Sequence, residues 1–129
     1  MPEPVQLRPA PAPATIVVIR LGERTLGDEK LSEQCERAFW RWGLHGFSVF
    51  EVPNDDYSLL ARLVPIVTVR PKLFEAHGAQ LLSAGFPLLP TADHPHWTVV
   101  LSEPTPAQFT RVRALFDGPK DNPAWSGRW

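Results

Sequence analysis

The feature that most constrains this chain is a regular alternation between short strand-like runs and longer segments with helical periodicity. Residues 15–19 form a β-branched run typical of a buried strand. Between Asp28 and Gly43, apolar residues recur at three- and four-residue steps, as on one face of a helix. Residues 47–52 alternate as a second strand, and the alternation favours a sheet covered by helices over an all-helical bundle.

The same pattern continues toward the C-terminus. The expected elements are a helix capped by Asn54 or Asp55, a strand over 66–69, a helix over 71–85, strands over 86–89 and 96–101, and a helix started by Thr105 and Pro106. The order is therefore βαβαβαββα. It predicts an α/β domain, with α+β as the variant, in which three to four helices cover a mixed sheet of about five strands.

Both ends of the chain are rich in residues that interrupt regular structure. Residues 1–14 contain five prolines, which favour an extended polyproline conformation and supply no core. Residues 118–129 combine glycine and proline with Trp125 and Trp129, which are expected to dock on the domain or on a partner. We therefore expect a disordered tail over 1–14, one domain over 15–117 and an irregular tail over 118–129.

Charge and cysteine content limit the classes of function. Lysine and arginine total 13 against 14 for aspartate and glutamate, so no long-range field attracts polyanions or membranes. The single cysteine, Cys35, cannot form an intrachain disulfide and fits a reducing compartment, so we expect a cytoplasmic protein. The apolar runs are too short to span a bilayer, and the four histidines lack zinc-site spacing, so no membrane, metal or cofactor role is expected.

The densest polar cluster is the segment 93–98, which lies at the predicted end of a strand, where scaffolds usually present function. His96 and Thr98 resemble one histidine–any–threonine motif of the two-histidine phosphoesterases, in which the imidazole moves a proton and the hydroxyl binds phosphate. The second motif is missing, because the segment 45–48 has one residue too many. The alternative is a histidine pair that caps the strand and hydrogen bonds to Asp93.

Arg20, Ser48 and Glu103 resemble, in order and placement, the arginine, serine and glutamate of small ADP-ribosyltransferase toxins. The resemblance implies that the arginine holds dinucleotide phosphates and that the glutamate stabilises the ribose cation. The chain departs from that family because Leu101 replaces the usual Gln or Glu two residues before Glu103, and because apolar residues flank Ser48. The alternative gives all three residues a structural role.

Basic and aromatic residues on one predicted helix suggest a third possibility. Trp40 stands beside Arg37 and Arg41, and such residues can stack bases and hold phosphates. Arg62, Arg70 and Lys72 are the other basic residues that could converge with them. Glu33 lies on the same stripe and is expected to pair with Arg37, which favours a solvated helix face instead.

Three stretches, read together, resemble small uncharacterised proteins of high-GC bacteria. They are residues 42–50, residues 82–91, and residues 94–101 followed by 121–124. This group is loosely associated with two-gene modules of the toxin–antitoxin kind. The resemblance covers most of the core, but it implies no particular activity and assigns no catalytic residue.

These observations leave two hypotheses from different classes. The first is a small cytoplasmic, toxin-like effector that acts on RNA, a nucleotide or NAD through Arg20, His94, His96, Thr98 and Glu103. The second is a non-catalytic interaction module, antitoxin-like or an adaptor, whose two tails bind a protein partner. The sequence leaves open whether the chain is an enzyme, and it identifies no substrate and no oligomeric state.

Overall fold

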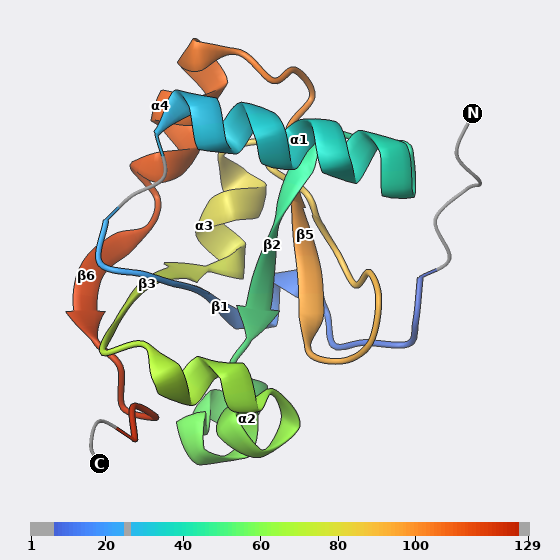
Figure 1. Cartoon of the computed structure of the whole chain (residues 1–129). Helices are drawn as coiled ribbons and strands as arrows, with labels where there is room; N and C mark the ends of the chain where they lie inside the picture. Colours follow the sequence, from blue (N-terminus) through green and yellow to red (C-terminus); the bar gives the residue numbers. More distant parts are fainter. Residues whose placement is uncertain (1–6, 25–26, 127–129) are drawn as a thin grey trace.

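Six strands form one antiparallel sheet in the computed structural model, which describes residues 7–24 and 27–126 (Figure 1). Across the sheet the strands are β4 (Leu88–Leu89), β5 (His96–Val100), β2 (Gly46–Glu51), β1 (Val17–Leu21), β3 (Lys72–His77) and β6 (Asp117–Asp121). The expected fold class, a sheet with covering helices, is confirmed. The sheet is larger than the five strands expected, and it is antiparallel throughout rather than mixed.

The described residues contain four α-helices: α1 (Asp28–Trp42), α2 (Tyr57–Leu63), α3 (Gly78–Ser83) and α4 (Pro106–Arg113). Gly43 ends α1 in the left-handed conformation, with φ 80°, and Thr105 caps α4 by accepting a hydrogen bond from a backbone N–H of its first turn. Both boundaries agree with the sequence prediction because a local cap sets each one. Asp56 caps α2, instead of Asn54 or Asp55. None of these helices is long and apolar enough to cross a membrane.

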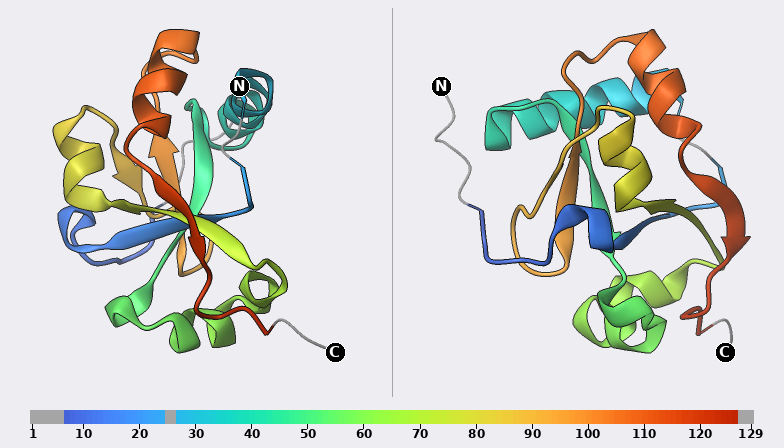
Figure 2. Two further views of the ribbon diagram at one scale, coloured as in Figure 1. Left: turned by 90° about the vertical axis from the view of Figure 1, so that its left-hand side faces the viewer. Right: turned by 180° about the vertical axis from the view of Figure 1, so that it is seen from behind.

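An apolar core lies on each face of the sheet. Val18 belongs to the core that packs against α1, α3 and α4, and its neighbour Ile19 belongs to the core that packs against α2. Successive residues of a strand point to opposite faces, so β1 supplies both cores. Figure 2 shows α3 and α4 close together and well separated from α2.

The middle of the chain differs from the sequence prediction. Residues 66–69, predicted as a strand, belong to the 3-10 helix η3 (Pro65–Val69). The predicted helix over 71–85 is divided into the strand β3 and the helix α3. Leu73 and Phe74 fit either periodicity, and the pairing of β3 with both β1 and β6 favours the strand because tertiary contacts override weak local preferences.

The predicted N-terminal tail is attached to the domain in its described part. Residues 1–6 lie outside the described residues, so the prediction of disorder is not addressed there. Arg8 donates a hydrogen bond from Nη2 to the backbone carbonyl of His96 at 2.6 Å. The 3-10 helix η1 (Pro13–Thr15) then leads into β1, so residues 7–14 do not form a free tail.

The predicted C-terminal tail contains a strand. β6 pairs with β3, and Lys120 donates to the Glu75 carboxylate at 2.9 Å across that pair. After β6, Asn122 donates from Nδ2 to two backbone carbonyls of the segment before β3. A glycine and a proline stand inside β6, and such residues indicate irregular structure when the pairing partner is unknown. Residues 127–129, which include Trp129, lie outside the described residues.

Candidate functional site

A groove of about 410 Å³ lies between α1 and the neighbouring strands β1, β2 and β5. Its polar side chains include Arg20 from β1, Arg37 and Arg41 from α1, Ser48 from β2, and His96 and Thr98 from β5. All of the lining residues are described, and none is an aspartate or glutamate. The groove therefore presents positive charge and hydroxyl groups to a ligand, without a competing carboxylate.

The register between β2 and β5 brings Ser48 next to His96. Ser48 lies opposite Thr98, and Phe50 lies opposite His96. Because residues two apart on a strand share a face, all four side chains project to the same side of the sheet. The Oγ atom of Ser48 lies 2.9 Å from Nε2 of His96, which is a hydrogen bond.

Thr91, in the loop between β4 and β5, fixes the other side of the imidazole. His96 Nδ1 lies 3.0 Å from the backbone carbonyl oxygen of Thr91 and 3.0 Å from its Oγ1, and that Oγ1 lies 2.7 Å from Oγ1 of Thr98. A carbonyl only accepts, so the neutral imidazole carries its proton on Nδ1 and leaves Nε2 free to accept the proton of Ser48. This is the arrangement of a nucleophile, a base and an orienting group.

Burial lowers the pKa of His96 below its ordinary value. Two charged groups add to the decrease, the guanidinium of Arg41 on α1 and that of Arg8 in the N-terminal segment, whereas the hydrogen bond to Thr91 opposes it. The unfolded chain therefore binds more protons than the folded chain between the lowered pKa and the ordinary value. In that range stability increases with pH, and the contribution of His96 is lost as the pH falls through its lowered pKa.

The arginines of the groove lack acidic partners among the described residues. Burial lowers the pKa of Arg20 to about 10, so the guanidinium remains charged at neutral pH, and its Cζ lies 5.0 Å from the centre of the Phe47 ring. Arg41 lies similarly over Trp42, at 4.5 Å. No described carboxylate forms an ion pair with Arg20, Arg37 or Arg41; the expected pairing of Glu33 is instead with Lys30. A partly desolvated, unpaired guanidinium favours an anionic ligand.

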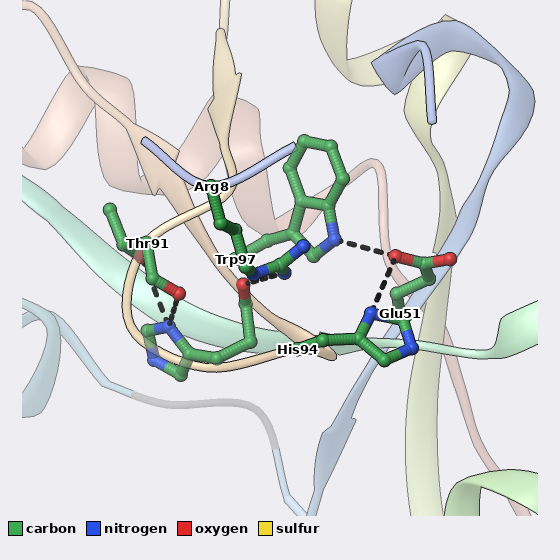
Figure 3. Close-up of polar contacts among 6 residues, drawn as sticks. Arg8, Glu51, Thr91, His94 and Trp97 are labelled. Carbon is green, nitrogen blue, oxygen red and sulfur yellow. Dashed lines mark hydrogen bonds and ion pairs between the residues drawn. The ribbon is translucent and has the colours of Figure 1, made fainter. Parts of the chain in front are cut away.

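His94 lies outside the groove, although it was grouped with His96 on sequence grounds. Figure 3 shows the carboxylate of Glu51 between the indole of Trp97 and the imidazole of His94. Trp97 donates from Nε1 to Glu51 Oε1 at 2.8 Å, and His94 Nδ1 lies 3.9 Å from the same oxygen. Glu51 is only 4% exposed. His94 therefore belongs to a contact that secures the loop before β5.

Glu103 is also absent from the groove. It lies between β5 and α4, where its backbone N–H faces the side-chain oxygen of Gln108 at 3.5 Å. The structure thus brings Arg20, His96 and Thr98 together and leaves His94 and Glu103 apart. The resemblance to ADP-ribosyltransferase toxins is therefore incomplete, because the residue matched to their glutamate, Glu103, does not line the groove.

The sequence analysis missed Thr91 and Arg8, two residues that contact His96. Thr91 stands in a loop rich in breakers, and Arg8 is 88 positions away from His96 along the chain. Their contacts depend on how distant segments pack, which no local pattern encodes. The partnership of Ser48 with His96 was also missed, although the correct register of two antiparallel strands would have indicated it.

Replacing Arg8 by glutamine should raise the pKa of His96. Arg8 donates to the carbonyl of His96 at 2.6 Å, and its positive charge disfavours a second positive charge on the imidazole. The pKa is measured by NMR titration of the imidazole nitrogens. Arg111→Gln is the matched control, because Arg111 also donates to a backbone carbonyl, that of Ala84, at 2.6 Å. An unchanged His96 pKa in Arg8→Gln would show that this charge does not reach the imidazole.

The comparisons with known proteins were negative. The chain matches no family model, no curated protein and no solved structure. The resemblance to small proteins of toxin–antitoxin modules therefore remains a prediction. The function has to be inferred from the groove itself.

Proposed function

We propose that this chain is a small enzyme that cleaves phosphate esters of the nucleotide type, with Ser48 as the nucleophile and His96 as the proton acceptor. One observation carries the proposal. The hydrogen bond between Ser48 Oγ and His96 Nε2, at 2.9 Å, faces a groove that contains three arginines and no carboxylate. RNA, nucleotides and NAD all carry the phosphate groups that such a groove would bind.

The charge of the groove supports a phosphate rather than a neutral substrate. Arginine presents a planar set of N–H donors that matches two oxygens of a phosphate at once. Arg41 on α1 is the groove arginine whose charge reaches His96, and Arg20 on β1 and Arg37 on α1 line the same groove, so a phosphate beside His96 would meet the guanidinium of Arg41 first. The same guanidinium groups would stabilise the negative charge that grows on the phosphate oxygens in the transition state.

The chemistry divides into two steps. First, Ser48 Oγ bonds to phosphorus while its proton passes to His96 Nε2; the bond to the leaving oxygen breaks, and that oxygen takes the proton from His96. Second, water attacks phosphorus, His96 accepts a proton from the water, and the bond between Oγ and phosphorus breaks as Ser48 recovers a proton. The sum is hydrolysis of one phosphate ester bond.

The interaction-module hypothesis has less support. It requires both tails to be free for a partner, whereas Arg8 and Asn122 hold the described parts of the two tails on the domain. Trp125 is 44% exposed and is the main observation in favour of a partner at the C-terminal end. The toxin-like role of the effector hypothesis stays a prediction, because the groove chemistry would serve many biological purposes.

Phosphate binding tests the charge of the groove independently of catalysis. We expect inorganic phosphate to raise the thermal midpoint of the wild-type chain. Arg41→Gln should weaken that binding by about ten- to a hundredfold, because a hydrogen bond to a charged group contributes about 1.5–3 kcal/mol. Midpoints measured against phosphate concentration give the affinity. Arg62→Gln, on α2 and not in the groove, is the control, and equal behaviour of the two variants would contradict the proposal.

A further inference from the structure

The outer surface of α1 continues the basic wall of the groove. A second hollow, open to solvent, is lined by Glu33, Glu36, Arg37, Trp40 and Arg41. It shares Arg37 and Arg41 with the groove that contains Ser48. The two arginines therefore stand on a ridge, with the reactive pair on one side and Trp40 on the other.

Trp40 is exposed to an unusual degree for so large an aromatic side chain. It is 66% exposed, the largest value among the exposed large apolar side chains of the described residues. Residues three and four apart on a helix are neighbours on its surface, so Arg37 lies directly beside Trp40 on the helix surface and Arg41 beside Arg37. An exposed ring beside unpaired guanidinium groups has the composition of a site where a base stacks and the adjoining phosphates are neutralised.

Neighbouring aromatic residues hold this end of the helix in place. The ring of Phe39 meets Trp40 edge to face, with ring centres 6.2 Å apart, and stacks on His45 at 4.9 Å. Trp40 is thus anchored through its neighbour without being buried. Glu36 is four residues before Trp40 and Glu33 is four before Arg37, so both carboxylates line the same hollow on the side toward the start of α1. Their negative charge would repel a polyanion there, so a phosphate chain would leave Trp40 toward Arg41.

We propose that the substrate of the groove is a single-stranded nucleic acid, with one phosphate beside Ser48 and a nearby base stacked on Trp40. The proposal rests on the phosphate chemistry proposed for Ser48 and His96. A free nucleotide held at Ser48 would not contact Trp40, which lies on the other side of Arg37 and Arg41. A nucleic-acid strand is long enough to contact Ser48, the two arginines and Trp40 together. In a duplex the bases are paired and stacked, so a single strand is the form that can offer a base to Trp40.

Binding of short labelled oligonucleotides tests this inference. Fluorescence anisotropy is measured at fixed salt with a 12-nucleotide oligouridylate, a 12-nucleotide oligothymidylate and a 12-base-pair duplex. Trp40→Ala should weaken binding of single strands by about 5- to 150-fold, since stacking on an aromatic residue contributes about 1–3 kcal/mol per base. Trp125→Ala is the matched control, because Trp125 is also exposed, at 44%, but lies near the C-terminus away from the groove.

The outcomes separate this inference from the function on which it rests. Weaker binding of either single strand in Trp40→Ala alone supports it, and the stronger of the two strands identifies RNA or DNA as the source of the ligand. Tighter binding of the duplex than of both single strands, or equal binding by Trp40→Ala and wild type, overturns it. Trp40→Ala and wild type could bind oligonucleotides equally while Arg41→Gln still weakens the binding of inorganic phosphate. That combination would support the proposed phosphate site and contradict a nucleic-acid strand as its substrate.

Discussion

The Ser48→Ala variant is expected to cleave phosphodiesters about 100- to 10,000-fold more slowly than wild type, the range usual for loss of a nucleophile or of its proton acceptor. Ser48 is exposed, and the hydrogen bond of its hydroxyl is to His96. Its removal should therefore leave the fold intact and act on the chemistry alone. The rate is followed by release of p-nitrophenolate from bis(p-nitrophenyl) phosphate, with circular dichroism as the check on folding.

The His96→Ala variant should lose a similar factor, and the double variant should be hardly slower than either single variant. Residues that act as one unit give such non-additive effects, because the loss of one removes the value of the other. Ser102→Ala and His77→Ala are the matched controls, since both residues lie outside the groove. A Ser48→Ala variant as active as wild type would exclude Ser48 as the nucleophile. A loss confined to His96→Ala would instead indicate a base that acts directly on a substrate hydroxyl or on water.

The parts of the fold that could be predicted are those that local chemistry determines. Gly43 and Thr105 mark helix ends through backbone conformation and capping, which involve only adjacent residues, and both were found. β3 and β6 were missed because each is stabilised by pairing with a distant segment. Lys120 and Glu75, for example, lie 45 positions apart and meet across that pair. The apolar residues over 71–85 fit a helical periodicity, but the pairing of β3 with distant strands outweighs that local preference.

The candidate site was predicted in part for the same reason. Arg20 and His96 lie near strand ends, where the rule that strand ends present function selects them, and Thr98 was selected by its spacing from His96. The rule also selected Glu103, because it does not say which ends lie together. Which hydroxyl meets His96 depends on the register of β2 with β5, and one residue of slip would turn Ser48 to the other face.

Gly46→Ala should be one of the most damaging small substitutions in the chain. A Cβ at Gly46 would lie 2.3 Å from the backbone carbonyl oxygen of Val99 and 2.7 Å from Cγ2 of Thr98. The carbonyl belongs to the backbone of β5, so β2 and β5 would have to move apart. We expect the free energy of unfolding to fall by about 3 kcal/mol or more, and the thermal midpoint by about 10 °C. Urea and thermal unfolding followed by circular dichroism measure both quantities.

Gly27→Ala is the control for this substitution, because a Cβ at Gly27 has no neighbouring atom within 4 Å. The strand separation in Gly46→Ala also displaces Thr98, whose hydroxyl lies 2.7 Å from Thr91 Oγ1 in the set of contacts that orients His96. The folded fraction of Gly46→Ala should therefore have a disturbed imidazole as well as a weakened sheet, visible as a changed NMR signal of His96 at temperatures where the chain remains folded. If Gly46→Ala were as stable as Gly27→Ala, the close approach of β2 to β5 would be wrong. The hydrogen bond between Ser48 and His96 would then be unsupported, because it joins the same two strands.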